Sequence, residues 1–430
     1  MPTPLMIGLA GLGTVGGGML KLLDTNRALI ERRAGRPIRV VAVSARDRHR
    51  ARDVDLSPYQ WTDDAAALAA RDDLGAVVEL IGGADGPALV IARETLGRGT
   101  PLITANKAML AHHGMELAAL AEARGAALKY EAAVAGGVPV IKALREGAAA
   151  NRVARVQGIL NGTCNYILSA MESEGVSFDR ALAAAQGRGF AEADPSFDVD
   201  GTDAAHKLAI LAALAFGTRL DFGAVRIEGI RRVTAADISE AAALGYRVRL
   251  VGQAEAGPVG LFQRVAPCLV PLGHPLAHAT GATNAVAVEG SHLGRLLLQG
   301  AGAGEGPTAS AVVADLIDVA RGEAGPAFAM PSDQLAVLAA ADAGARRGRA
   351  YLRFTVADRP GVLAEITAAT RDAGVSIASL IQRGAGPDGA VTLVMVTHAG
   401  EERCVADALR RLAGSAGLLK EPMLMRILGE

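Results

Sequence analysis

The sequence predicts an α/β protein of two or three domains. Its 430 residues exceed the usual size of one domain, which is about 100 to 200 residues. Hydrophobic residues make up 50% of the chain but aromatic residues only 3%, so the cores must consist of small aliphatic side chains, with backbones approaching at glycines. Up to about residue 134, short β-rich runs alternate with helical stretches, which is typical of a parallel, doubly wound sheet.

The elements of the first domain, residues 1–134, follow from that alternation. Each short apolar run has the length of a strand, and each longer stretch rich in Ala and Leu has the length of a covering helix. The expected strands are residues 5–10, 38–44, 76–81, 102–104 and 127–131, and the expected helices are 15–33, 63–71, 88–97 and 113–124.

A second domain, residues 135–306, mixes both kinds of element and predicts an α+β substrate domain. We expect helices over 137–146, 165–174, 178–188, 203–216 and 235–244, and strands over 152–160, 247–255 and 261–269. A strong helix within 307–321 then returns the chain to the first domain.

The segment 322–348 is rich in Gly, Ala, Pro and Arg, as expected of a linker. The last domain, residues 349–430, has the order β-α-β-β-α-β of a ferredoxin-like unit. Its elements are expected at 350–356, 361–373, 376–382, 390–397, 401–413 and 422–427.

Charge and cysteine content exclude several classes of function. Lys and Arg (44) balance Asp and Glu (45), so no global field recruits nucleic acid or an anionic membrane, and small-molecule partners are favoured. The three cysteines are far apart and no signal segment precedes them, which indicates reduced thiols in a cytoplasmic protein. The apolar run 208–216 is too short to cross a bilayer.

The motif Gly11-Leu-Gly13-Thr14-Val15-Gly16 follows an apolar strand and opens a helix. The first glycine allows a tight turn, the second a close approach of pyrophosphate, and the third close helix packing. The free N–H groups at the helix start, residues 14–17, favour an anion there. This context predicts a Rossmann-type dinucleotide site; the alternative is a structural glycine-rich turn.

The end of the second strand bears on the choice of cofactor. No carboxylate stands at its tip, where one would bond a ribose 2′-hydroxyl, but Arg46 does, and an arginine accommodates a 2′-phosphate. NADP(H) is therefore favoured over NAD(H). The alternative is that Arg46 is a solvated loop charge.

Lys107 follows the fourth strand, at the carboxyl edge of the sheet where open α/β folds bind their ligands. A lysine there could meet a nicotinamide or an oxyanion. The alternative is an ordinary surface lysine.

The densest group of charges lies between residues 192 and 207. Five carboxylates fall within twelve residues: Glu192, Asp194, Asp198, Asp200 and Asp203. Because they repel one another, they need cationic side chains or a cationic ligand nearby. Lys207 stands four residues after Asp203, so both can point into one pocket from one helix face. A lysine beside a buried aspartate can supply the proton that reduction of an aldehyde requires.

Two other interpretations compete for this segment. A calcium loop fails because a loop started at Asp194 or Asp198 puts Lys207 or Ile210 near the closing position, where Glu is required. Asp203 could also simply cap its helix. His206 is expected to be structural, because nothing supplies a second His or Cys ligand nearby.

Together these segments resemble the homoserine dehydrogenase family, in the family's order from residue 7 to about 320. The resemblance is carried by residues 11–16, 78–83, 104–107, 131–139, 158–168, the acidic block, 300–304 and 307–310. It implies reduction of L-aspartate 4-semialdehyde to L-homoserine by NAD(P)H, on the way to threonine and methionine. The departures, Cys164 for a common Thr and Ala301 for a common Pro, affect local packing more than chemistry.

The resemblance also implies roles for single residues. Lys207 would be the proton donor, Glu192, Asp198 and Asp203 would hold the amino acid, and Lys107 would sit between cofactor and substrate. Gly302 and Gly304 would lie against the cofactor. A monovalent cation, Na⁺ or K⁺, would bind at residues matching Glu131, Val134, Gly136 and Val138. A homodimer or homotetramer is implied as well.

The last domain resembles an ACT module, carried by residues 351–366 and 375–380. Asp358 is expected to cap the following helix, and Gly361 to let a ligand approach its free N–H groups. Such modules usually pair and bind amino acids, which suggests threonine as an effector. The alternative is a dimerisation module without a ligand.

Two further hypotheses remain for the whole chain. It could be a dehydrogenase for another semialdehyde or amino acid, or a catalytically silent amino-acid sensor. Intact Lys107, Asp203 and Lys207 argue against the sensor.

Overall fold

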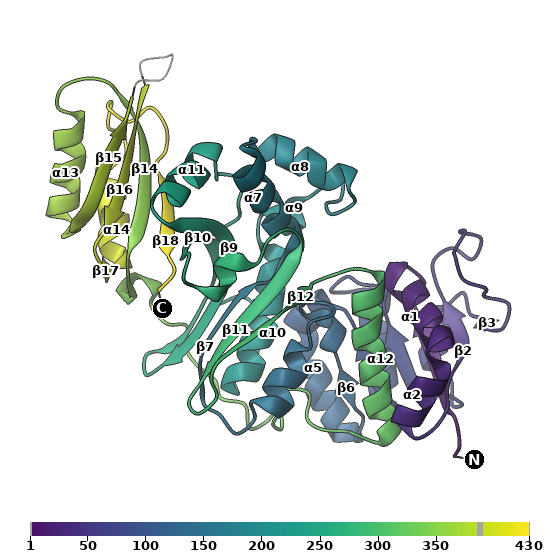
Figure 1. Ribbon diagram of the computed structural model, residues 1–430. Helices are drawn as coiled ribbons and strands as arrows, with labels where there is room; N and C mark the ends of the chain where they lie inside the picture. Colours follow the sequence, from purple (N-terminus) through teal and green to yellow (C-terminus); the bar gives the residue numbers. More distant parts are fainter. Residues whose placement is uncertain (1, 385–389, 430) are drawn as a thin grey trace.

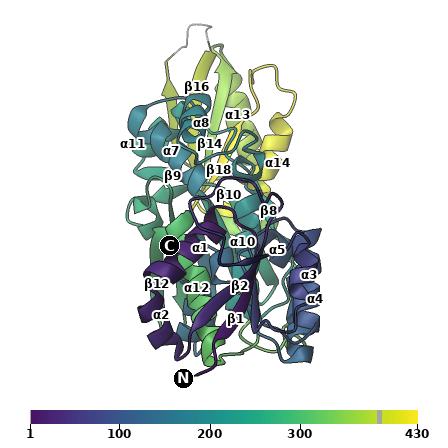
Figure 2. The same cartoon turned by 90° about the vertical axis from the view of Figure 1, so that its right-hand side faces the viewer.

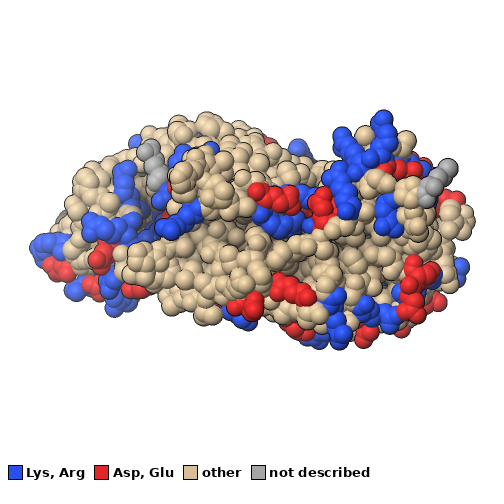
Figure 3. Space-filling view, turned by 90° about the horizontal axis from the view of Figure 1, so that it is seen from below, with Lys and Arg blue, Asp and Glu red and all other residues tan. Residues whose placement is uncertain are grey.

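The computed structural model describes residues 2–384 and 390–429. Three units follow one another across the molecule: the amino-terminal sheet with its helices, a central sheet-rich unit, and the carboxy-terminal unit (Figure 1). Blue and red side chains are interspersed on the face seen in Figure 3, in keeping with the formal net charge of −1. Within the described residues, no helix combines the length and apolarity needed to cross a membrane.

The first unit is a parallel six-stranded sheet in the order β3-β2-β1-β4-β5-β6. Helices cover both of its faces, with α1, α2 and α12 on one side and α3, α4 and α5 on the other (Figure 2). This is the doubly wound sheet that the alternating pattern predicts. The elements are β1 Leu5–Ala10, α1 Thr14–Thr25, α2 Arg27–Ala34, β2 Ile38–Ser44, β3 Gln60–Trp61, α3 Ala65–Ala69, β4 Ala76–Glu79, α4 Pro87–Gly97, β5 Leu102–Thr104, α5 Lys107–Arg124 and β6 Leu128–Lys129.

Two helices of this unit differ from expectation. The helix expected over 15–33 is interrupted at Asn26, which separates α1 from α2. Helix α5 begins six residues before its expected start, because the Asn106 side chain caps it by accepting a hydrogen bond from Met109 N at 3.0 Å. Lys107 is therefore the first helical residue rather than a loop residue.

The second unit contains β7 Val153–Ile159, α7 Gly162–Glu174, α8 Phe178–Gly187, α9 Ser196–Val199, α10 Thr202–Phe216, β8 Arg226–Ile227, α11 Ala235–Ala243, β9 Tyr246–Gly257, β10 Gly260–Pro271, β11 Thr283–Gly290 and β12 Gly294–Ala301. Sequence reasoning missed the β11–β12 hairpin, whose second strand is largely exposed and whose turn is closed by Gly294 in the left-handed region (φ +69°).

The helix expected over 137–146 is only partly formed. A three-residue helix α6, Val140–Lys142, continues as a π-helical turn, Ala143–Gly147. Its first N–H groups are taken by a distant side chain, since the Glu131 carboxylate accepts from Ile141 N at 3.0 Å and Lys142 N at 2.9 Å.

The return helix α12, Glu305–Arg321, lies beside α1 (Figure 1). Val312 and Leu316 share one buried core with Ile7 of β1. The segment 322–348 that follows is not a free linker: Phe328 is buried, Tyr130 Oη donates to Ala327 O at 2.7 Å, and bridges join Ala336 to Thr218 and Ala340 to Leu261.

The last unit has the expected β-α-β-β-α-β order, with β14 Ala350–Ala357, α13 Val362–Asp372, β15 Ile377–Arg383, β16 Ala390–Thr397, α14 Glu402–Leu412 and β18 Met423–Ile427; a small pair, β13 Arg347–Gly348 and β17 Gly400–Glu401, flanks it. Strand β18 also pairs in parallel with β10, through Cys268 opposite Arg426 and Leu269 opposite Ile427. The sheets of the second and third units are thereby one ten-stranded sheet.

Buried ion pairs reinforce this junction. Asp237 of α11, with no exposed surface, accepts hydrogen bonds from Arg353 Nε (2.6 Å), Arg353 Nη2 (3.0 Å) and Tyr351 Oη (3.1 Å) of β14. Near the β10–β18 pairing, Glu402 accepts from Arg264 at 2.8 Å. The third unit is thus docked by charge as well as by strand pairing.

Candidate active site

The glycine-rich loop lies between β1 and α1. Gly11 has φ +103°, and a Cβ there would come within 2.5 Å of the Leu80 backbone; a Cβ on Gly16 would lie 2.1 Å from Gly11 O. A Cβ on Gly13 would meet nothing within 4 Å. The first and third glycines are therefore required by packing, while the second faces open space. No side chain caps α1, so its first N–H groups at Thr14 and Val15 are available to an anion.

A cavity of about 1,090 Å³ adjoins this loop and is lined by Gly11, Gly13 and Arg46. Arg50 and Arg52, which sequence reasoning did not single out, line it too. The Arg52 guanidinium donates to Leu12 O at 3.2 Å and to Asp47 O at 2.7 Å, so it ties the loop after β2 to the glycine-rich loop. The signal available in the sequence was the run of arginines that follows β2.

A second cavity, of about 960 Å³, lies between the first two units. Helix α10 contributes Asp203 and, one turn later, Lys207, whereas α5 contributes Lys107. Lys207 Nζ lies 2.7 Å from Asp203 Oδ2, and Lys107 Nζ lies 3.1 Å from Asp203 Oδ1. One carboxylate, 3% exposed, therefore holds two lysines from two domains.

The charges in this cavity shift one another's pKa. Burial opposes ionisation of Asp203, but the two lysines outweigh it and hold its pKa well below the usual range. Burial would lower the pKa of Lys107, yet the charge of Asp203 keeps it raised. Burial and the charge of Asp203 raise the pKa of Asp198. Asp203 therefore stays anionic, and both lysines have a fixed counter-ion.

Asn161, missed by sequence reasoning, orders these carboxylates. Its Nδ2 donates to Asp198 Oδ1 and to Asp203 Oδ2, each at 2.7 Å, while its Oδ1 accepts from Cys164 N at 2.7 Å as the cap of α7. The signal was an Asn directly before a helix start. Asp203 itself caps no helix, because its side chain turns to the lysines and Gly201 is the N-cap residue of α10.

A buried network around Glu79, also missed, positions Lys107. Glu79 accepts from Ile81 N at 2.6 Å and from Thr104 Oγ1 at 2.6 Å, and Asn106 donates to Gly83 O at 2.7 Å. These bonds fix the loop after β4 and the start of α5 together.

Other predicted residues divide between the cavity and its surroundings. Asp198, Gly302 and Gly304 line it. Glu192 is exposed and not among the lining residues, although its charge contributes to the raised pKa of Lys107. A Cβ on Gly302 would lie 2.1 Å from the Asn284 side chain, so this loop has no room for a larger residue.

The residues expected to hold a cation lie against that loop. A Cβ on Gly136 would come within 2.4 Å of Gly302 O, and Glu131, Val134 and Val138 are buried. Burial and the neighbouring Asp315 raise the pKa of Glu131 to about 7. The Oδ1 atom of Asp315 is buried without a hydrogen-bond partner among the described residues. The ammonium of Lys142 lies 3.8 Å from this atom, so the site combines two adjacent buried carboxylates with one lysine. Carboxylate oxygens of this kind suit a hard cation of low charge.

His206 lies beside this site in a small aromatic cluster. Its ring is 4.4 Å from that of Phe222 and 5.3 Å from that of His112. Burial, with a contribution from His112, lowers its pKa to about 4. The sequence suggested no second His or Cys metal ligand near His206. The His112 ring is a neighbour in space, but within the described residues no group of three candidate metal ligands occurs.

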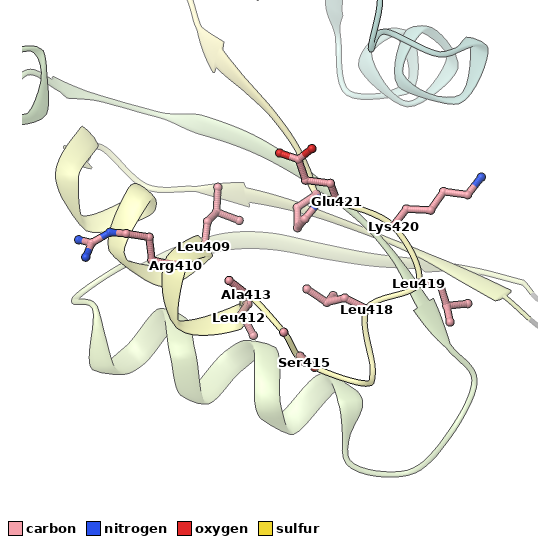
Figure 4. Close-up of a pocket in the computed structure, with 11 residues that line it drawn as sticks. Leu409, Arg410, Leu412, Ala413, Ser415, Leu418, Leu419, Lys420 and Glu421 are labelled. Carbon is pink, nitrogen blue, oxygen red and sulfur yellow. The ribbon is translucent and has the colours of Figure 1, made fainter.

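In the third unit, Asp358 does not cap α13: the N-cap residue is Gly361 (φ +96°), without a side-chain cap. A cavity of about 540 Å³ lies between the end of α14 and residues 413–422. Figure 4 shows Leu412 and Leu418 facing it, while Arg410 and Lys420 point away. Its inward face is therefore mainly apolar.

Comparisons with known proteins agree over the whole chain. The family model described as homoserine dehydrogenase matches residues 139–317, its NAD binding domain matches residues 11–131, and the ACT domain matches residues 350–414. Homoserine dehydrogenases from Pseudomonas aeruginosa and Neisseria gonorrhoeae are each 42% identical to the chain, over 99% and 94% of both sequences respectively. A solved homoserine dehydrogenase from Thiobacillus denitrificans superposes with a TM-score of 0.93 at 42% identity, covering 99% of this chain and 98% of that one.

Proposed function

The chain belongs to the homoserine dehydrogenase family, and from that premise we propose that it reversibly reduces L-aspartate 4-semialdehyde to L-homoserine, for threonine and methionine synthesis in the cytoplasm. The observation that carries the proposal is Asp203 between Lys107 and Lys207 in one cavity with the loop of Gly302 and Gly304. This arrangement brings proton donors from two domains to one carboxylate, beside a nucleotide-binding unit.

Lys207 is the proposed acid and base. Its Nζ donates to Asp203 at 2.7 Å and to Leu160 O at 2.8 Å, which leaves its third proton for a substrate oxygen. A reduced nicotinamide, when bound, supplies the hydride that forms the C–H bond. As the aldehyde becomes an alkoxide, Lys207 gives up its proton, and in the reverse reaction it takes one back. Lys107 would donate to the reacting oxygen, and Asp203 would hold both lysines in place. Asp198 and Asp203 would hold the substrate ammonium, with the charge of Glu192 contributing from outside the cavity.

A steady-state assay tests this function. Oxidation of reduced cofactor with L-aspartate 4-semialdehyde is the expected result. No turnover with this aldehyde would reject the proposal; faster turnover with another semialdehyde or amino acid would favour the broader dehydrogenase hypothesis, and cofactor binding without any turnover the sensor.

The proposed cofactor is NADP(H), because Arg46 and Arg50 line the cavity beside the glycine-rich loop. An archaeal homoserine dehydrogenase, 26% identical over 74% of this chain, is described as solved in complex with NADPH. Arg46→Ala should raise KM for NADPH by about tenfold, the loss of one charged hydrogen bond, and leave KM for NADH nearly unchanged. An equal change for both cofactors would identify Arg46 as a solvated loop charge.

Two further parts of the proposal concern ions and regulation. A monovalent cation would be held by the Glu131 carboxylate together with backbone oxygens of Val134, Gly136 and Val138; replacing NaCl and KCl by choline chloride should then lower activity.

Threonine would act through the ACT domain of a homodimer or homotetramer. Rate measurements with added threonine, and light scattering for the assembly size, test these two points.

A further inference from the structure

Arg188 is a cation on the wall of the active-site cavity that the proposed mechanism does not use. It follows the last residue of α8, Gly187, and lines the same cavity as Lys107 and Lys207. Both lysines are paired with Asp203, whereas Arg188 makes no ion pair with any described residue. Its guanidinium instead lies 5.5 Å from the centre of the Tyr166 ring.

The loop that carries Arg188 is tied to the first turns of α7, while the Arg188 side chain itself is exposed. Tyr166 belongs to α7, and its ring lies 4.9 Å from that of Phe190 in the same loop as Arg188. Thr163 Oγ1 donates to Phe190 O at 2.7 Å and so ties this loop to the start of the helix. Arg188 and the amino-terminal turn of α7 therefore stand next to each other at one side of the cavity.

That turn has donors of its own. Asn161 caps the N–H of Cys164, but the N–H groups of Gly162 and Thr163 have no intrahelical acceptor, and both residues line the cavity. An anion there would meet the positive end of the helix dipole as well as Arg188.

We propose that Arg188, together with the first turn of α7, binds the α-carboxylate of the amino-acid substrate. The inference rests on the proposed function, which supplies a substrate with one carboxylate, one ammonium and one carbonyl oxygen. Asp198 and Asp203 suit the ammonium and the lysines suit the carbonyl oxygen, so the carboxylate still needs a cation.

Arginine suits this role better than a third lysine would. Its planar fork binds both oxygens of a carboxylate. The guanidinium lies 5.5 Å from the centre of the Tyr166 ring and, among the described residues, its N–H groups have no hydrogen-bond acceptor. Arg188 would thus select amino-acid substrates over small alcohols or aldehydes that lack a carboxylate.

The test compares two alcohols as substrates for oxidation: L-homoserine, and 3-aminopropan-1-ol, which lacks the carboxylate. Arg188→Gln should raise KM for L-homoserine by about 10- to 100-fold, the loss of a charged hydrogen bond, with kcat changed less than about threefold. It should leave kcat/KM for 3-aminopropan-1-ol unchanged. Arg188→Lys should fall between. Arg180→Gln also removes an exposed arginine, but one in α8 and outside the cavity, and should behave like wild type.

Equal losses with both alcohols, or a loss confined to kcat, would overturn the role of Arg188 while leaving the proposed function standing. A wild-type protein that oxidises neither alcohol and reduces no aspartate semialdehyde would overturn both.

Discussion

Two regions of the molecule surround a buried aspartate with cations, yet they use different cations. In the active-site cavity, Asp203 pairs with Lys107 and Lys207; at the junction with the ACT domain, Asp237 pairs with Arg353. The Lys107 side chain is 34% exposed, whereas those of Lys207 and Arg353 are similarly buried, at 10% and 12%. Lysine can release a proton in a suitable site, whereas arginine stays charged. Under the proposed function, similar buried ion pairs would serve proton transfer where lysines line a cavity and docking where an arginine joins two units.

The largest effect is expected on turnover, from changes to Lys207 in the active-site cavity. Lys207→Arg keeps a positive charge beside Asp203 but removes the group that exchanges a proton. We expect kcat to fall by about 10²- to 10⁴-fold, the usual contribution of acid–base catalysis, and Lys207→Ala to abolish turnover. Binding of reduced cofactor, measured by its fluorescence, should be unchanged in both. A Lys207→Arg enzyme within tenfold of wild type would reject Lys207 as the proton donor.

The second-largest effect is expected on stability, from a change at the junction with the ACT domain. Asp237→Asn leaves Arg353 buried without its counter-charge, which costs about 3 to 5 kcal/mol in comparable buried pairs. We expect a lower urea midpoint by circular dichroism, with activity per folded molecule retained. The control is Asp407→Asn on α14, whose pairs with Arg410 and Arg411 are exposed and should contribute less than about 1 kcal/mol. Similar losses in the two variants would show that the buried junction is no different from the surface.

A smaller effect is expected on the pH dependence of the free energy of unfolding. Because the pKa of His206 is lowered to about 4, it stays neutral in the folded protein where an unfolded chain would bind a proton. Its contribution is complete above about pH 6.5 and is lost as pH falls towards about 4. The charged or titratable groups around it are His112, Asp203, Lys107 and Lys207.

His206→Phe should therefore reduce the acid-induced loss of stability between pH 6.5 and 4.5 by on the order of 2 kcal/mol. Urea unfolding at several pH values measures it. At pH 8 the two proteins should differ little. If His206→Phe loses as much stability as the wild type between pH 6.5 and 4.5, another group controls that loss.

Much of the fold was predictable because it depends on local patterns. Strand and helix lengths gave the doubly wound sheet and the ferredoxin-like unit, and the spacing of Asp203 and Lys207 put them on one helix face. These signals need only neighbours in sequence.

The remainder depended on contacts between distant residues. The Glu131 carboxylate caps the short helix formed within 137–146, and Asn161 joins Asp198 to Asp203 from some forty residues away. The segment 322–348 has the composition of a linker but packs along the second domain. Neither composition nor periodicity carries information about such pairings, so they became visible only in the structure.

The pairing of β18 with β10 also bears on how the chain is made. Strand β10 is complete at Pro271, but β18, at Met423–Ile427, is almost the last segment to be synthesised. Until then, among the described residues, one side of β10 is paired only with the short β8 and, through Leu261, with Ala340, and an uncovered strand edge invites association with other chains. Removing the ACT domain by truncation would make that interval permanent. The shortened chain should therefore be prone to aggregation, so a simple cut at the domain boundary would remove more than the ACT domain's proposed effector response.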